Sequence, residues 1–197
     1  MKGKDMKNAG RITFTVFAIC LLMACTKQTD SQNTIFNYFD IVSVNQNINV
    51  FNDEAKKWDN DFYLAMIEIL FGTMRSGMLN LVYESPNKDQ VALSIWQYSD
   101  GTIESEQILR SNINRQNEIT ISDQFVDSKD IFETAIQDKK VLGFIINKDI
   151  CGIMKLDKTI IKNEQLKWLL IFRECEDPLK YFKIEVDAIN REIFFPE

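Results

Sequence analysis

Residues 79–109 read LNLVYESPNKDQVALSIWQYSDGTIESEQIL, and this stretch decides the class of fold. Its three runs, 79–84, 90–98 and 102–109, are rich in β-branched and aromatic side chains, which favour strands. The turn sequences SPNKD and SDG separate the runs, and short turns of this composition join neighbouring strands as hairpins. The stretch therefore predicts an antiparallel β-meander.

A helix is expected before this meander. Asn52 or Asp53 can cap a helix that spans about 54–71, because either side chain accepts hydrogen bonds from backbone N–H groups of a first turn. The apolar side chains that recur at helical spacing are Trp58, Phe62, Ala65, Met66 and Ile69. We expect Trp58, Phe62 and Ile69 to face the core from one side of this helix.

A second helix and a second meander are expected downstream. Asp127 or Ser128 can cap a helix over 129–138. The residues on its apolar face are Ile131, Phe132, Ala135 and Ile136. Strands are predicted at 119–121, 141–147, 150–155, 165–174, 181–186 and 193–195.

The predicted fold class is α+β, with antiparallel β-meander sheets each packed by a helix. The order of helix then meander occurs twice, which indicates either a duplication or a chance likeness, since the two halves share little residue identity. We expect one helix-plus-meander unit at 35–122 and another at 123–197, or a single domain that contains both.

Composition narrows the classes of function. The chain has 197 residues, of which 45% are hydrophobic and 26% charged, and it can therefore bury a core. Its 7 Gly leave little material for a Gly-rich phosphate loop. Histidine is absent, which excludes Ser-His-Asp and Cys-His sites and the His-based metalloprotease motifs. We expect neither a cofactor nor a metal.

The first residues have the pattern of a secretory signal. Residues 1–11 are short and basic, 12–24 carry no charge, and the chain becomes polar again directly after residue 25. A membrane-spanning helix needs about 20 apolar residues, so this run is too short to span.

The run closes with Leu22-Met23-Ala24-Cys25, which resembles the lipobox of bacterial lipoproteins. The resemblance implies cleavage of a signal peptide at 1–24, lipid attachment at Cys25, and a flexible tether at 25–34. In a host with two membranes, Thr26 directly after the Cys resembles the pattern of lipoproteins that are sorted to the outer membrane, where they face the periplasm. The alternatives are an ordinary secretory signal and an uncleaved anchor.

Removal of residues 1–24 would leave 19 basic and 28 acidic side chains, a net charge of −9. Such a surface repels nucleic acid and anionic headgroups, so we expect no nucleic-acid partner. We expect the protein to contact the membrane through its N-terminal lipid.

Two cysteines remain after processing, Cys151 and Cys175. An even number in an exported domain favours a disulfide, and each lies in or beside a predicted strand. The alternative is two separate buried thiols.

The tail 181–193, YFKIEVDAINREI, resembles the closing hairpin of PepSY-type domains, in which an alternating strand ends in Val-Asp-Ala and returns with Glu and an aliphatic residue. Residues 167–172 resemble the preceding strand, and the helix over 127–138 would pack across the sheet. Asn190-Arg191 stands where the family commonly has Thr-Gly. The resemblance covers 127–195 and implies a domain that binds or restrains partners; a generic α+β meander is the alternative.

Acidic clusters are the remaining candidates for chemistry. Asp59 with Asp61, or Glu174 with Glu176 and Asp177, have the residue type for glycosidic cleavage or Ca²⁺ binding, but such clusters usually lie in solvated turns. We therefore expect no catalytic residues and no enzyme activity.

The chain is interpreted as a non-catalytic binding or inhibitory module with a protein partner in the cell envelope. The alternatives are a carboxylate-dependent envelope enzyme and a structural envelope-assembly lipoprotein.

We predict that Cys25 carries the lipid, because it directly follows an apolar run and a small residue. Metabolic labelling with a fatty acid should mark the wild-type protein and not the Cys25→Ser variant. Label that persists in the variant would contradict the assignment.

Overall fold

The computed structural model describes residues 39–72, 77–110, 126–157 and 166–196. In chain order the elements are α2 (Val44–Trp58), β1 (Tyr63–Gly72), β2 (Met78–Glu84), β3 (Val91–Gln97), β4 (Ile103–Leu109), α3 (Ser128–Gln137), α4 (Lys139–Ile145), β5 (Ile150–Asp157), β6 (Lys167–Glu174), β7 (Tyr181–Asp187) and β8 (Ile193–Phe194). Within this part of the chain the fold is α+β with antiparallel strands, as the sequence predicts. Cys25 and the tether lie outside the described residues, as does the strand predicted at 119–121.

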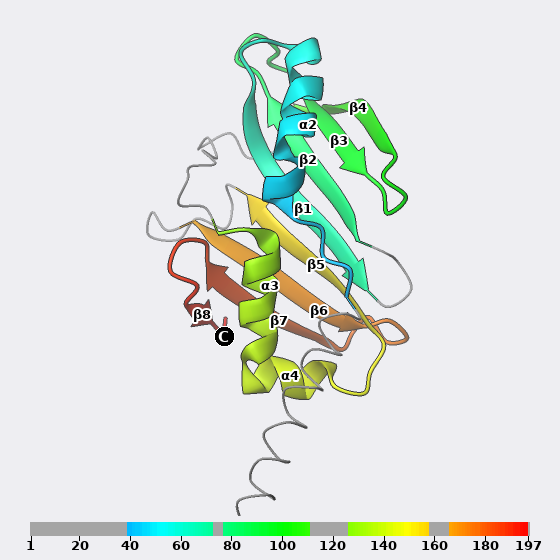
Figure 1. The fold of residues 1–197 in the computed structure, drawn as a ribbon, viewed down its shortest axis with the longest axis vertical. Helices are drawn as coiled ribbons and strands as arrows, with labels where there is room; N and C mark the ends of the chain where they lie inside the picture. The colour runs from blue at the N-terminus through cyan, green and yellow to red at the C-terminus, as the bar shows by residue number, and fades with distance from the viewer. Residues whose placement is uncertain (1–38, 73–76, 111–125, 158–165, 197) are drawn as a thin grey trace, which may run out of the picture. The chain divides into compact units, whose positions relative to one another are not determined.

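The two predicted meanders join into one sheet. The strand order is β4-β3-β2-β1-β5-β6-β7-β8, and β1 pairs with β5 at the centre. The helices α2 and α3 lie on the same side of this sheet, α2 over the strands of the first meander and α3 over those of the second (Figure 1). One helix precedes the four strands of the first half and two helices, α3 and α4, precede those of the second. That the halves arose by duplication stays a prediction.

The predicted helix over 54–71 is wrong. The helix α2 begins at Val44, capped by the side chain of Ser43, and ends at Trp58, after which 63–72 form the strand β1. Burial alternates along this strand, with Ala65, Ile67, Ile69 and Phe71 buried, but Met66 and Leu70 on the other face are also apolar, so the sequence itself shows no clear two-residue alternation. A short apolar run of this kind cannot be distinguished from a buried helix by periodicity alone.

The three side chains expected on one helical face are consequently separated. Trp58 is the half-buried last residue of α2, and Phe62 is half-buried before β1, with its ring centroid 5.5 Å from that of Tyr83. Ile69 alone among them is fully buried, on β1.

The predicted strand over 141–147 is also wrong, because 139–145 form the helix α4. Asp138 ends α3 and begins α4, where its carboxylate accepts hydrogen bonds from the backbone N–H groups of Lys140 and Val141. Such a cap starts a helix even where the following residues favour strands. Val141 and Ile145, one turn apart, are buried.

Apart from the strand at 119–121, which lies outside the described residues, the other predicted elements are confirmed, with ends shifted by one or two residues. Asp127 caps α3, as expected, and also reaches α2: its carboxylate accepts hydrogen bonds from Lys129 N, from the Ser43 hydroxyl at 2.9 Å and from Asn45 N at 2.8 Å. One carboxylate therefore satisfies donors at the N-termini of both helices, where negative charge is favoured.

Aromatic rings fill the core between α3 and the centre of the sheet. Phe71 on β1 makes edge contacts with Phe39, Phe132 and Phe172, with centroids 5.1–5.7 Å apart. A Cβ at Gly152 would meet the ring of Phe71 at 2.1 Å, so this position on β5 needs glycine.

The C-terminal hairpin forms between β7 and β8. The buried Asp187 accepts hydrogen bonds at Oδ1 from the N–H groups of Ile189 and Asn190. Arg191 takes a positive φ of 66° and its guanidinium contacts Asp130 on α3 at 3.0 Å. The aspartate of the Val-Asp-Ala sequence is thus the residue that organises the turn.

A disulfide joins Cys151 on β5 to Cys175, which directly follows β6, with a Cα–Cα distance of 5.3 Å. The backbone N–H of Cys175 donates to the carbonyl of Asp149 at 2.9 Å, which holds the two segments side by side. The separation lies within the range that a disulfide can bridge.

We predict that this disulfide forms in the exported protein and stabilises it. The bond links residues 24 apart in sequence, and chain-entropy reasoning gives roughly 3 to 4 kcal/mol of stabilisation for such a loop. Urea unfolding of the Cys151→Ala/Cys175→Ala variant should show this loss. Two free thiols titrated in unfolded, non-reduced protein purified from the envelope would contradict the prediction.

Candidate functional site

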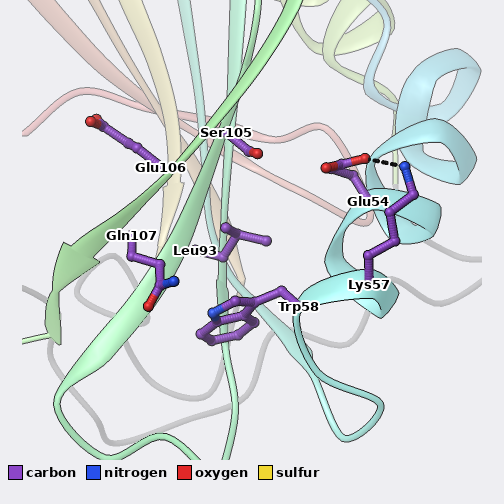
Figure 2. Close-up of a pocket in the computed structure, with 7 residues that line it drawn as sticks. All are labelled: Glu54, Lys57, Trp58, Leu93, Ser105, Glu106 and Gln107. Atoms are coloured by element: carbon purple, nitrogen blue, oxygen red, sulfur yellow. Dashed lines mark hydrogen bonds and ion pairs between the residues drawn. The ribbon is translucent and has the colours of Figure 1, made fainter.

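The candidate site is a pocket between α2 and the edge of the sheet at β3 and β4, with a volume of about 270 Å³ (Figure 2). Its lining residues are Glu54, Lys57, Trp58, Leu93, Ser105, Glu106 and Gln107. Pockets for drug-sized ligands occupy about 300–1,000 Å³, so this one is sized for one or two side chains.

Buried side chains and a polar contact to β2 hold the helix α2 over the sheet. Phe51 and Ala55 are fully buried, and the Tyr83 hydroxyl on β2 donates to the side-chain oxygen of Asn52 at 2.9 Å. Burial raises the pKa of Tyr83, so its hydroxyl stays protonated as a donor at neutral pH. These contacts place the last turn of α2 beside β3 and β4.

Trp58 forms one wall of the pocket. The Nζ of Lys88 donates to the carbonyl of Trp58 at 2.9 Å and lies 4.6 Å from the centroid of its ring, which fixes the indole in place. The indole Nε1 is buried and has no hydrogen-bond partner within the described residues. A buried donor left without an acceptor costs about 1–3 kcal/mol, so an acceptor brought by a ligand would be favoured here.

Two of the charged groups at the pocket form an ion pair. Lys57 Nζ lies 2.6 Å from Glu54 Oε2, and this hydrogen bond raises the pKa of Lys57 above its ordinary value. Lys57 is therefore held protonated at neutral pH and is unsuited to act as a base. The side chain of Glu106 points away from Trp58 and Leu93 in Figure 2.

The strand β4 supplies the outer rim of the pocket and is an edge strand. Ile103, Ser105, Gln107 and Leu109 are exposed, and within the described ranges β4 pairs with β3 alone. Tyr98 N donates to Thr102 O, and the N–H that directly follows β4 donates to Gln90 O. Since antiparallel pairs alternate, the even-numbered residues of β4 bond to β3 and the odd-numbered ones direct their N–H and C=O groups outward.

A buried ion pair anchors this edge strand. The guanidinium of Arg110, directly after β4, lies 2.7 Å from Oε2 of Glu84 at the end of β2, and these side chains are 7% and 0% exposed. The Tyr63 hydroxyl on β1 donates to the same carboxylate oxygen at 2.8 Å. Burial lowers the pKa of Arg110, but the hydrogen bond and charge of Glu84 raise it overall, so the guanidinium stays charged.

The acidic clusters considered in the sequence lie in turns. Asp59 and Asp61 follow α2, where the N–H of Asp61 donates to Asp59 and lowers the pKa of Asp59; Asn87 contacts both carboxylates. Hydrogen bonds therefore favour the ionised form of Asp59, which is unsuited to a general acid.

The second cluster behaves in the same way. Glu174 lies 2.7 Å from Lys148, and this hydrogen bond lowers the pKa of Glu174. Asp177 pairs with Lys180 at 3.3 Å, and Glu176 is exposed. Across the described residues, no group of three or more Cys, Asp or Glu side chains is placed to hold a metal ion.

Sequence reasoning did not bring the pocket residues together. It assigned Trp58 to the core and gave no role to 103–109. One signal was available: the run IESEQIL has polar side chains at four consecutive positions, 104–107, and so on both faces, a pattern typical of an exposed edge strand. The disulfide, by contrast, lies in the other half of the strand order, away from the pocket.

No protein-family model matches the sequence, and no curated protein or solved structure is significantly similar to the chain. None of the described helices is long and apolar enough to cross a membrane.

We predict that Glu84→Gln destabilises the protein by about 3–5 kcal/mol, because it leaves the Arg110 charge buried without its counter-ion. Glu54→Gln, which breaks the solvent-exposed pair with Lys57, is the matched control and should leave the urea midpoint nearly unchanged. A loss below about 1 kcal/mol for Glu84→Gln would mean that the pair does not anchor β4.

Proposed function

We propose that this chain is a lipid-anchored protein of the cell envelope that acts as a non-catalytic binding or inhibitory module for a protein partner. The observation that carries this proposal is the exposed edge strand β4 beside a small pocket, an arrangement suited to recognising another polypeptide. The resemblance of 127–195 to PepSY-type domains agrees with such a role.

Anchorage is supported by the lipobox-like sequence at 22–25. The lipid would hold the domain on the outward face of a membrane, at the outer membrane facing the periplasm in a host with two membranes. The polar tether at 25–34 would let the domain reach a partner near the bilayer. A net charge of −9 after processing disfavours nucleic acid as that partner.

The carboxylate enzyme is the weaker candidate on chemical grounds. Glycoside cleavage needs one carboxyl group held protonated near neutral pH, which requires a raised pKa. Hydrogen bonds lower the pKa of Asp59 and of Glu174, the opposite direction.

We predict that crosslinking of intact cells captures a specific envelope protein, and that the same protein, once tagged, recovers this chain. A fusion of residues 1–34 to an unrelated domain is the matched control, because it shares the tether and lacks the fold. Capture of the same proteins by the fusion, or of none by the full chain, would contradict a binding function. Turnover of an envelope glycan that is lost in Asp59→Asn would instead favour the enzyme.

A further inference from the structure

We propose that the outer edge of β4 binds an extended segment of a partner protein as a ninth strand of the sheet. The segment would alternate cationic side chains with short side chains that end in an acceptor oxygen, such as threonine. This inference rests on the proposed binding function and names the chemistry of its partner.

The backbone of β4 supplies the register for such a strand. Ser105 and Gln107 direct their N–H and C=O groups outward, so a partner residue opposite either one would exchange two hydrogen bonds with it. Added strands gain affinity from these main-chain bonds and specificity from alternate side chains. The exposed backbone of β4 can therefore act as the template.

On the side of β4 that faces α2, the site favours partner side chains that are short and carry a hydrogen-bond acceptor. Residues opposite Ser105 and Gln107 would point to the same side as those two, toward the pocket walled by Trp58 and Leu93. A threonine there would lie beside Ser105 and Gln107 and would keep its hydroxyl oxygen on the side of the sheet where Trp58 carries its unpartnered Nε1. The cavity of about 270 Å³ has room for a side chain of this size.

The other side of the edge selects cations. Glu104 and Glu106 are exposed and lie on the sheet face opposite the helices, and the Tyr98 hydroxyl donates to Glu104 at 3.0 Å. Partner residues facing these glutamates would occupy the non-hydrogen-bonded positions, where opposing side chains approach most closely. Lysine or arginine is favoured at such positions and glutamate is disfavoured. The partner segment therefore alternates short side chains that carry an acceptor with lysine or arginine.

Fluorescence anisotropy of labelled peptides with the full chain in detergent tests this proposal. A soluble peptide that alternates lysine and threonine should bind, about tenfold or more tightly than one that alternates glutamate and threonine. A lysine–threonine peptide of the same composition in two blocks controls for charge alone. Equal binding of the block peptide would overturn the strand register.

Variants separate the three parts of the site. Glu104→Lys/Glu106→Lys should reverse the charge preference of the peptides, and Trp58→Phe should weaken the lysine–threonine peptide about fivefold by removing one donor. Gln107→Pro removes an outward N–H without breaking a bond to β3 and should abolish binding, whereas Gln107→Thr keeps the N–H and should bind as the wild type does.

Two outcomes overturn the edge site: no binding of the alternating peptide, or binding that the charge reversal leaves unchanged. If either occurs while crosslinking still recovers a specific partner, the edge site is wrong and the binding function stands. If crosslinking recovers no specific partner, the binding function itself fails. Should Gln107→Pro not fold, the charge reversal decides, because it changes exposed side chains only.

Discussion

Seven residue pairs between β1 and β5, from Met66–Asp157 to Gly72–Cys151, join the two meanders, and the remaining architecture depends on this pairing. It places one strand from each half at the centre of the sheet, where both edges of each strand are hydrogen-bonded. It also brings Phe71 over Gly152, so that the aromatic core under α3 draws on both halves. The shared capping by Asp127 then ties the N-termini of α2 and α3 together on one face.

Pairing at the centre moves the exposed edges to the last strands of each half, β4 and β8. The edge at β8 is two residues long, whereas β4 offers seven residues and is anchored at its end by the buried pair of Arg110 and Glu84. Long exposed edges are a liability in soluble proteins, and charged side chains on them limit indiscriminate pairing. Glu104 and Glu106 have this effect on β4, and the same charges can make pairing selective.

Much of the fold could be predicted because most strands of the two meanders have strong local sequence signals. The runs 79–109 and 165–187 alternate or are bounded by turn residues, and their strands form where expected. The two errors arose where the local pattern is ambiguous or is overridden: 63–72 has apolar residues on both faces although its burial alternates, and 139–145 is helical because Asp138 caps it. The pocket could not be predicted, since Trp58 and 103–109 are far apart in sequence.

By itself the sequence determined the α+β class, the antiparallel connections and the residues that cap α3, whereas the cellular address that its lipobox-like N-terminus implies stays a prediction. These depend on turn residues, side-chain type and spacing, which act over a few neighbouring positions. Only the tertiary structure decided that the two meanders share one sheet, that Cys151 lies 5.3 Å from Cys175 between Cα atoms, and that β4 is the long open edge. These depend on which strands pair across long stretches of chain, and strand pairing is set by mutual burial of faces, which no local pattern records.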